Sequence, residues 1–261
     1  MNNILNTELD KFKILYPNTE FYFFEEIDST NNFCKTLAKE DFSNPTVVLS
    51  DTQSCGRGTK GRSWTSPKGT GLWFSILLKP NFPPKFLGSI PLLTATAIYE
   101  SLSEFGIKSS IKWPNDIFIK DKKVCGILTE SNLSNNKIEY LIVGIGINVN
   151  LSFNDFDPEL QDKATSLKIS YNKDFNRFDI LNVILKNFNS LYYKLTEDKI
   201  KCIIENYKAN SCVLNKKVSL HYNNTYEIVT PIDVMNDGSL LVKDTNNKSK
   251  QIHSGEVSLR F

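Results

Sequence analysis

The sequence predicts an α+β fold, in which a mixed, mostly antiparallel sheet is flanked by helices and followed by a small C-terminal β-barrel domain. The chain has 261 residues, of which 40% are hydrophobic, and this suffices for a sizeable core. Predicted helices and strands segregate along the chain and do not alternate strictly, which is typical of α+β folds. After Ser211, short strands follow at close spacing and favour a small barrel. We therefore predict domains at 1–211 and 212–261.

Each element is predicted from its local pattern. Phe33, Leu37 and Ala38 share one face of a helix over 31–39, whose start Ser29 or Thr30 can cap. An early proline and a terminal glycine delimit a second helix over 91–105. Short β-branched or aromatic runs predict strands. These strands are 21–27, 46–51, 72–79, 109–113, 124–130, 139–149, 218–222, 226–234 and 239–244, while 178–208 is helical in two pieces.

Composition excludes several classes of function. The 31 basic and 29 acidic residues nearly cancel, so net charge indicates neither a nucleic-acid nor a membrane partner. Apolar stretches such as 141–149 are shorter than the roughly 20 residues that span a bilayer. No export signal is visible, and the five cysteines lack a CxxC pair. We therefore expect a cytoplasmic protein with reduced thiols and no protein-bound metal.

Residues 51–71 form the most unusual segment. Five glycines lie among the cations Arg57, Lys60, Arg62 and Lys68, with Trp64 between them. Glycines let backbone N–H groups approach a ligand, and cations hold carboxylate or phosphate oxygens. The segment does not match the phosphate-loop pattern of nucleotide hydrolases. An anion-binding loop is favoured over a solvated surface turn, and a nucleic-acid interface is weaker because no wider basic face supports it.

Two further segments carry polar residues beside strands. Lys112, Asn115 and Asp116 cluster at a Pro-Asn turn, and Lys123 follows. A hairpin over 109–130 would bring both lysines to one pocket, although a surface hairpin with solvated lysines fits the same pattern. The GxGxN pattern within 143–150 indicates a strand with close backbone approaches, under a ligand or under packed side chains.

Taken together, these segments resemble biotin protein ligases. The matching motifs are DSTNN at 28–32, GRGTKGRSW at 56–64, KWPNDI at 112–117, KKVCGILTE at 122–130 and GIGINVN at 144–150. The resemblance covers roughly residues 21–170, and its C-terminal domain, a Src-homology-3-like barrel, also agrees. The residues before Asp28 are too few for a helix-turn-helix domain, so we expect the short form without a DNA-binding domain.

The resemblance implies a biotin site. Ser29, Thr30 and Asn31 would hold the ureido end of biotin, and Gln53 would line the pocket. The glycine-rich loop would be disordered without ligand and would close over biotin and its adenylate. Lys123 would contact the biotin carboxylate and then the phosphate. The implied biotin-binding residues are Ser29, Thr30, Asn31, Gln53, Gly56, Arg57, Gly58, Thr59, Lys123 and Gly126.

The resemblance also implies a nucleotide site and a reaction. ATP with Mg²⁺ would convert biotin to biotinyl-AMP, and the biotinyl group would pass to a lysine of a biotin carboxyl carrier domain in a biotin-dependent carboxylase. It further suggests homodimers formed by sheet extension. The implied ATP or adenylate ligands are Arg62, Trp64, Lys112, Asn115 and Asn148, and the implied catalytic residues are Arg57, Lys112, Asp116 and Lys123.

One departure from the family pattern matters. Thr59 stands where many relatives hold an arginine, so one cation that would retain the adenylate is absent unless Lys60 or Arg62 substitutes. We therefore expect weaker retention of the adenylate and labelling of bystander lysines. Two alternatives stay open: a lipoate ligase-like acyl-adenylating enzyme, against which KWPNDI argues, and a non-catalytic biotin-binding module, against which Lys112 and Lys123 argue.

Overall fold

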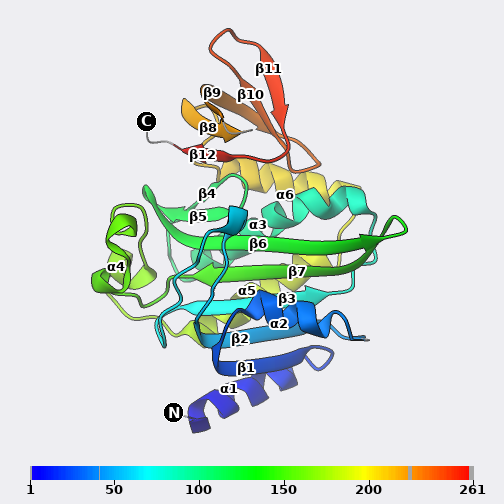
Figure 1. Ribbon diagram of the computed structural model, residues 1–261, viewed down its shortest axis with the longest axis vertical. Coiled ribbons are helices and arrows are strands. Elements are labelled where there is room, and N and C mark those ends of the chain that lie inside the picture. Colours follow the sequence, from blue (N-terminus) through cyan, green and yellow to red (C-terminus); the bar gives the residue numbers. More distant parts are fainter. Residues whose placement is uncertain (1, 41, 223–224, 259–261) are drawn as a thin grey trace. The chain divides into compact units, whose positions relative to one another are not determined.

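A computed structural model describes residues 2–40, 42–222 and 225–258 (Figure 1). The chain divides into two compact units. Unit 1 comprises Met1–Pro84 and Asp121–Val183, and unit 2 comprises Lys85–Lys120 and Ile184–Phe261. No helix in the described ranges is long and apolar enough to cross a membrane.

Unit 1 contains five strands of a mixed, mostly antiparallel sheet. Their order is β1-β2-β3-β7-β6. β1 and β2 pair in parallel, whereas β2–β3, β3–β7 and β7–β6 are antiparallel. This arrangement confirms the predicted sheet type. The strands are β1 (Glu20–Ile27), β2 (Thr46–Gln53), β3 (Leu72–Leu78), β6 (Lys122–Ser134) and β7 (Lys137–Ile147).

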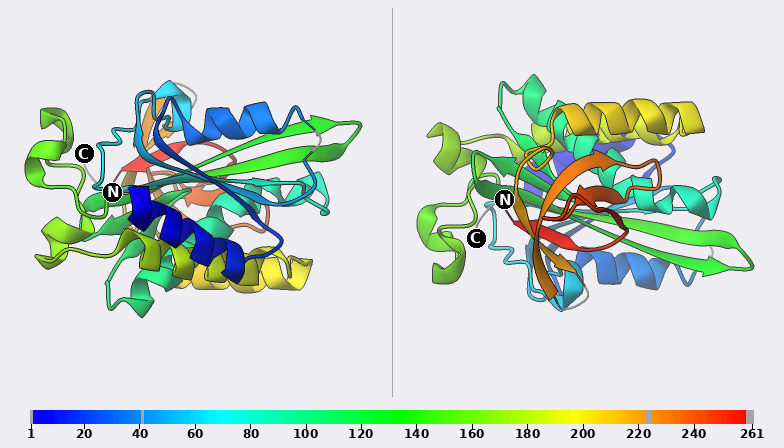
Figure 2. Two further views of the ribbon diagram at one scale, coloured as in Figure 1. Left: turned by 90° about the horizontal axis from the view of Figure 1, so that it is seen from below. Right: turned by 90° about the horizontal axis from the view of Figure 1, so that it is seen from above.

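Helices cover both faces of the unit 1 sheet. α2 (Thr30–Leu37) lies on one face, and α1 (Asn2–Leu15) lies on the other (Figure 2). Beneath α2, a core cluster unites Cys34, Val48, Leu77 and Ile142, all fully buried. Ser29 is the N-terminal cap residue of α2, but its side chain makes no capping hydrogen bond. α4 (Leu167–Tyr171) also belongs to unit 1, and α5 (Arg177–Tyr192) begins there and ends in unit 2.

α1 was not predicted from the sequence. Its local pattern is weak, and it is polar over most of its length. Phe12, which is 3% exposed, packs against Phe21 of β1 and Phe178 of α5. Tertiary packing of this aromatic side chain therefore supports a helix that local propensity alone does not specify.

Unit 2 combines two packed helices, a hairpin and a small sheet. α3 (Ile90–Glu104) contacts α6 (Glu197–Ala209), and β4 (Ser110–Lys112) pairs antiparallel with β5 (Asp116–Ile119). The second sheet has the order β11-β10-β9-β8-β12 and only antiparallel pairs. It confirms the predicted separate C-terminal β-structure. Its strands are β8 (Val218–Tyr222), β9 (Thr225–Val234), β10 (Leu240–Lys243), β11 (Ser249–Ile252) and β12 (Glu256–Ser258).

Several short elements escaped prediction. β5, β11 and β12 have three or four residues each, and α4 has five. A run this short holds too few periods to reveal its type. β5 also divides the expected 109–130 hairpin, because β4 pairs with β5 through Lys112 and Asp116.

Candidate functional site

Buried polar side chains gather at the start of α2 in unit 1. Ser29, Thr30 and Asn31 are at most 4% exposed. The Thr30 backbone N–H and hydroxyl donate to Oε1 of Gln53 at 2.9 and 3.2 Å. Nε2 of Gln53 donates to the Ser66 hydroxyl at 3.0 Å. Because Oε1 accepts two hydrogen bonds, the orientation of the Gln53 amide is determined by its neighbours.

Ser75 links this cluster to the sheet. It is completely buried in β3, and its hydroxyl lies 2.7 Å from Oγ1 of Thr30 and 2.6 Å from Oδ1 of Asn31. On the other side, Nδ2 of Asn31 donates to Glu130 at 2.9 Å. The amide of Asn31 is thus held from both ends.

Three glycines of β6 and β7 form a floor without side chains. A β-carbon added to Gly144 would lie 2.1 Å from Oδ1 of Asn31, and one added to Gly146 would lie 2.5 Å from Nε1 of Trp64. Gly126 is the cross-strand partner of Gly146 and also lies under the Trp64 ring. The close backbone approaches predicted for residues 143–150 are therefore present. The side chains of Asn31 and Trp64 leave no room for a methyl group on Gly144 or Gly146.

The Trp64 ring lies over Gly126 and Gly146, and the ammonium group of Lys123 lies beside the ring. Nζ of Lys123 is 5.1 Å from the centre of the Trp64 ring, which is a cation–π distance. Nε1 of Trp64 is buried and finds no hydrogen-bond acceptor within the described residues. A buried indole N–H usually has a partner, so this donor is suited to a ligand acceptor.

Glu130 of β6 forms ion pairs with Lys35 and Arg57, two cations of unit 1. Its carboxylate accepts from Nζ of Lys35 at 2.7 Å and lies 3.2 and 3.3 Å from Nη1 of Arg57. Burial raises the pKa of the Glu130 carboxyl, but the hydrogen bonds from Lys35 and Asn31 and the charge of Arg57 outweigh burial. The pKa of Glu130 therefore lies below its ordinary value, and the carboxylate stays ionised at neutral pH.

The crest of the glycine-rich loop, residues 57–62, folds back on itself. The backbone N–H of Gly58 donates to the Arg62 carbonyl at 2.7 Å, and that of Trp64 donates to Gly56 at 2.8 Å. Nη2 of Arg62 donates to the Thr59 hydroxyl at 3.1 Å. The two limbs of the loop, residues 52–56 and 63–67, line a cleft of about 360 Å³. This volume is within the range of small-molecule sites.

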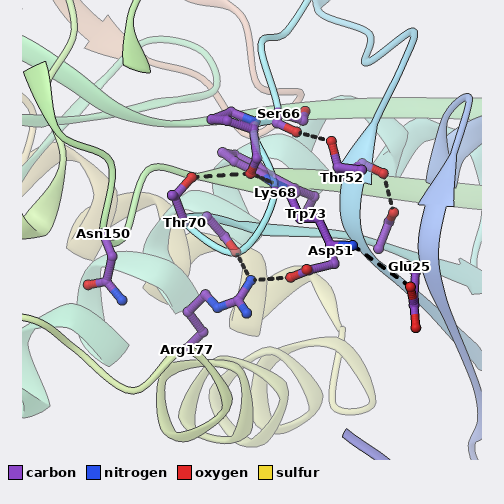
Figure 3. Close-up of polar contacts among 12 residues, drawn as sticks. Glu25, Asp51, Thr52, Ser66, Lys68, Thr70, Trp73, Asn150 and Arg177 are labelled. Atoms are coloured by element: carbon purple, nitrogen blue, oxygen red, sulfur yellow. Dashed lines mark hydrogen bonds and ion pairs between the residues drawn. The ribbon is translucent and has the colours of Figure 1, made fainter. Parts of the chain in front are cut away.

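The base of the loop is anchored by an ion pair. Arg177, at the start of α5, points toward Asp51, and its Nη1 donates to Asp51 and to the Gly71 carbonyl at 2.9 Å each (Figure 3). Nearby, the Thr52 hydroxyl donates to the Ser66 carbonyl at 2.8 Å. The ends of the loop are therefore joined to the sheet and to α5 independently of its crest.

The KWPND segment lies in unit 2. Lys112 and Asp116 are cross-strand partners in the β4–β5 hairpin, and Nζ of Lys112 lies 5.0 Å from the Phe118 ring centre. The fully buried Tyr207 donates to the Pro114 carbonyl at 3.2 Å. Burial raises the pKa of Tyr207 well above its ordinary value, so this hydroxyl remains a donor.

The C-terminal sheet also supports this segment within unit 2. The indole N–H of Trp113 donates to the Gly238 carbonyl at 3.0 Å, in the turn between β9 and β10. A β-carbon on Gly238 would lie 2.0 Å from the Gly88 carbonyl, so this turn packs closely against the segment before α3. Trp113 is 2% exposed and is a core residue of unit 2.

Comparisons with known proteins agree with this geometry. The model of the biotin/lipoate A/B protein ligase family matches residues 23–148. The bifunctional ligase/repressor BirA of Bacillus subtilis is 35% identical over 237 residues, which cover 89% of this chain and 72% of that protein. The chain belongs to the biotin protein ligase family.

Other members of the biotin protein ligase family show the same likeness. The solved biotin protein ligase of Aquifex aeolicus, in complex with biotin and ATP, matches with a TM-score of 0.72 and 32% identity, over 92% of this chain and 97% of that one. The biotin–[acetyl-CoA-carboxylase] ligase of Paracoccus denitrificans is 34% identical over 125 residues, 47% of this chain and 51% of that enzyme.

The structure of this biotin protein ligase family member places most of the predicted site residues in unit 1 and three in unit 2. Asn148 is 4% exposed, and its amide donates to the Thr165 carbonyl at 3.0 Å. The predicted convergence of Lys112 and Lys123 on one pocket stays a prediction. The unit 1 residues are Ser29, Thr30, Asn31, Gln53, Gly56, Arg57, Gly58, Thr59, Arg62, Trp64, Lys123, Gly126 and Asn148, and the unit 2 residues are Lys112, Asn115 and Asp116.

Sequence reasoning missed the residues that support the site in this biotin protein ligase family member. Ser75 gives one signal, since it is the single polar residue in the apolar run of β3. Glu130 ends the KKVCGILTE motif but has no local feature that distinguishes it from a solvated glutamate. Lys35 pairs with Glu130, which is 95 residues away along the chain, and Asp51 pairs with Arg177, which is 126 residues away. No local pattern could reveal these pairs.

Proposed function

We propose that this protein is an ATP-dependent biotin protein ligase that forms biotinyl-5′-AMP and transfers biotin to a lysine of a biotin carboxyl carrier domain. The observation that carries this proposal is the arrangement in unit 1 of a buried Ser-Thr-Asn-Gln network, a glycine floor and a cation beside it. Biotin has a polar ureido end, an apolar body and a carboxylate tail. We match the ureido end to the polar network, the apolar body to the glycine floor and the carboxylate to the cation.

In the proposed complex, Thr30, Asn31 and Gln53 exchange hydrogen bonds with the ureido group. Gly126, Gly144 and Gly146 let the side chains of Asn31 and Trp64 approach the sheet closely, and the apolar body would lie against these side chains. Lys123 meets the carboxylate. The buried N–H of Trp64 offers one more donor to the ligand.

The first proposed step activates the carboxylate. A biotin carboxylate oxygen attacks the α-phosphate of ATP, the new O–P bond forms, and pyrophosphate leaves. Lys112, Lys123 and Arg57 offset negative charge during this step. Asn115 and Asp116 supply oxygen donors of the type that Mg²⁺ prefers, and the ion would neutralise phosphate charge when bound with ATP.

The second proposed step is transfer to the acceptor. The neutral lysine amine attacks the acyl carbon of biotinyl-AMP, AMP leaves, and Asp116 accepts the proton of the amine. Closure of the glycine-rich loop keeps water away from the mixed anhydride until the acceptor arrives. Relatives named as ligases of acetyl-CoA carboxylase support a carrier domain of a biotin-dependent carboxylase as the acceptor.

Pyrophosphate release from ATP tests this proposal. We expect release that depends on biotin and is abolished in Lys123→Met. The neighbouring Lys122→Met is the matched control, because Lys122 donates to the Gln161 carbonyl and lies outside the proposed site. Release with lipoate or octanoate in place of biotin would move the protein to the lipoate branch of the family. Biotin binding without release would favour the non-catalytic alternative.

Four sequence-based expectations stay predictions. They are the domain boundary between residues 211 and 212, a homodimer formed by sheet extension, the lack of a DNA partner, and a cytoplasmic location. Size-exclusion chromatography with light scattering tests the dimer, and fractionation of cells that express the tagged full chain tests the location.

A further inference from the structure

We propose that Glu130 is a positioning residue of the ligand pocket, which determines the orientation of the Asn31 amide and anchors Arg57 of the glycine-rich loop. This inference rests on the proposed function, because Asn31 and Arg57 are taken to serve the biotin site. Glu130 itself lies at the far end of the KKVCGILTE motif and carries no chemical role in the proposed reaction.

The Asn31 amide needs an external group to set its direction. The Ser75 hydroxyl can donate to an amide oxygen or accept from an amide N–H, so Ser75 alone permits both orientations. An ionised carboxylate only accepts hydrogen bonds. Glu130 therefore requires Nδ2 of Asn31 on its side, at 2.9 Å, and leaves Oδ1 toward Ser75 at 2.6 Å.

The orientation of Asn31 matters because of where the amide lies. Its Oδ1 lies over Gly144 of the glycine floor. A rotated amide would present a donor where Asn31 now presents an acceptor. The ureido group of biotin has both a carbonyl and N–H groups. A rotated Asn31 would therefore place a donor opposite a ureido N–H or an acceptor opposite the ureido carbonyl. Glu130 thereby affects ligand recognition through Asn31.

The second role of Glu130 concerns the loop. Nη1 of Arg57 lies 3.2 Å from the carboxylate and donates to Oδ1 of Asn32 at 3.2 Å. Lys35 shares the same carboxylate. If the charge of Glu130 is removed, two cations face each other without an anion between them, and the loop crest loses an anchor.

The magnitudes favour Asn31 as the more important partner. The Arg57 side chain is 39% exposed, and ion pairs at such positions contribute little. Asn31 is 4% exposed, and hydrogen bonds from buried groups to charged acceptors are among the stronger ones. We therefore expect a large effect on ligand affinity and a smaller effect on loop order.

The test compares Glu130→Gln with Glu139→Gln. Glutamine is isosteric with glutamate, but its amide donates as well as accepts, so it permits both orientations of Asn31. Glu139, on the neighbouring strand β7, accepts from Asn132 and is the matched control. By titration calorimetry, we expect biotin affinity to fall about tenfold or more in Glu130→Gln, in line with loss of a hydrogen bond to a charged group. Glu139→Gln should change affinity less than twofold.

Limited trypsin digestion without biotin provides the second measurement. Trypsin cleaves after Arg57, Lys60 and Arg62, all in the loop crest. We expect faster cleavage there in Glu130→Gln than in the wild type, and no change in Glu139→Gln. Lys35→Met, which leaves the Glu130–Asn31 hydrogen bond in place, should retain biotin affinity within about threefold.

The outcomes separate this inference from the proposed function. If the wild type does not bind biotin, the proposed function fails, whatever Glu130 does. If the wild type binds biotin and Glu130→Gln binds it equally well, or if both glutamate variants lose affinity alike, the positioning role is refuted. Should Glu130→Gln not fold, Arg57→Gln replaces it: faster cleavage after Lys60 at an unchanged melting temperature supports the loop anchor, and unchanged cleavage refutes it.

Discussion

The buried hydroxyl of Ser75 lies 2.6 Å from Oδ1 of Asn31 and joins the middle of the sheet to the start of α2. Ser75 also lies 2.7 Å from the Thr30 hydroxyl, so one side chain contacts two residues of the DSTNN motif. A polar group with no exposure is tolerated in an apolar strand only when it is hydrogen-bonded.

Ser75→Ala should therefore lower stability and biotin affinity together. Loss of the hydroxyl leaves buried acceptors unsatisfied, which costs about 1–3 kcal/mol in the free energy of unfolding. Urea unfolding and biotin calorimetry measure the two effects. Ser101→Ala is the control, because Ser101 is equally buried and bonds the Ala97 carbonyl in unit 2. A variant of Ser75 that loses stability but keeps full biotin affinity would separate Ser75 from the pocket.

Gly144→Ala should block the pocket. Its new methyl group would lie 2.1 Å from Oδ1 of Asn31, so the amide must move. We expect overpacking to cost about 1–3 kcal/mol and biotin affinity to fall more than about tenfold. Thermal melting and calorimetry check both. Gly255→Ala meets only contacts of 3.3 Å or longer and should be mild; equal effects at both glycines would contradict the glycine floor.

Arg177→Met should be strongly destabilising. Arg177 pairs with Asp51, whose side chain is 4% exposed, so the variant leaves a buried carboxylate without its cation. Breaking such a pair costs about 3–5 kcal/mol. The exposed pair of Lys168 and Asp174 is the comparison, and Lys168→Met should cost less than about 1 kcal/mol. Equal losses in urea unfolding would show that Arg177 does not anchor the loop base.

The contribution of Glu130 to stability should depend on pH. Its pKa in the folded protein lies below the ordinary value of 4.5. The folded state thus favours the ionised form, and this stabilisation is present above pH 4.5 and disappears as the pH falls through the lower pKa of the folded state. The difference in melting temperature between the wild type and Glu130→Gln should therefore be larger at pH 7 than at acidic pH. A difference that grows on acidification would contradict this sign.

Thr59 should weaken retention of the adenylate. Thr59 has a neutral side chain where many relatives hold an arginine, and its hydroxyl accepts a hydrogen bond from Nη2 of Arg62 at 3.1 Å. We expect the wild type to label lysines of a bystander protein and Thr59→Arg to label fewer at equal acceptor biotinylation. Mass spectrometry of the mixture measures both reactions. Labelling confined to the acceptor at long times would overturn this expectation.

Local patterns were sufficient for the long strands, for the helices α2, α3, α5 and α6, and for the motif segments. Hydrophobic periodicity and glycine-rich spacing are properties of contiguous residues. The supporting residues required the folded chain. Ser75 meets Asn31, Asn31 meets Glu130, and Arg177 meets Asp51 only through sheet pairing and helix packing across large sequence separations. α1 also needed tertiary contacts, since Phe12 is buried by Phe21 and Phe178. A sequence shows which groups are available for chemistry, but hydrogen bonds and burial depend on distances that only the tertiary structure determines.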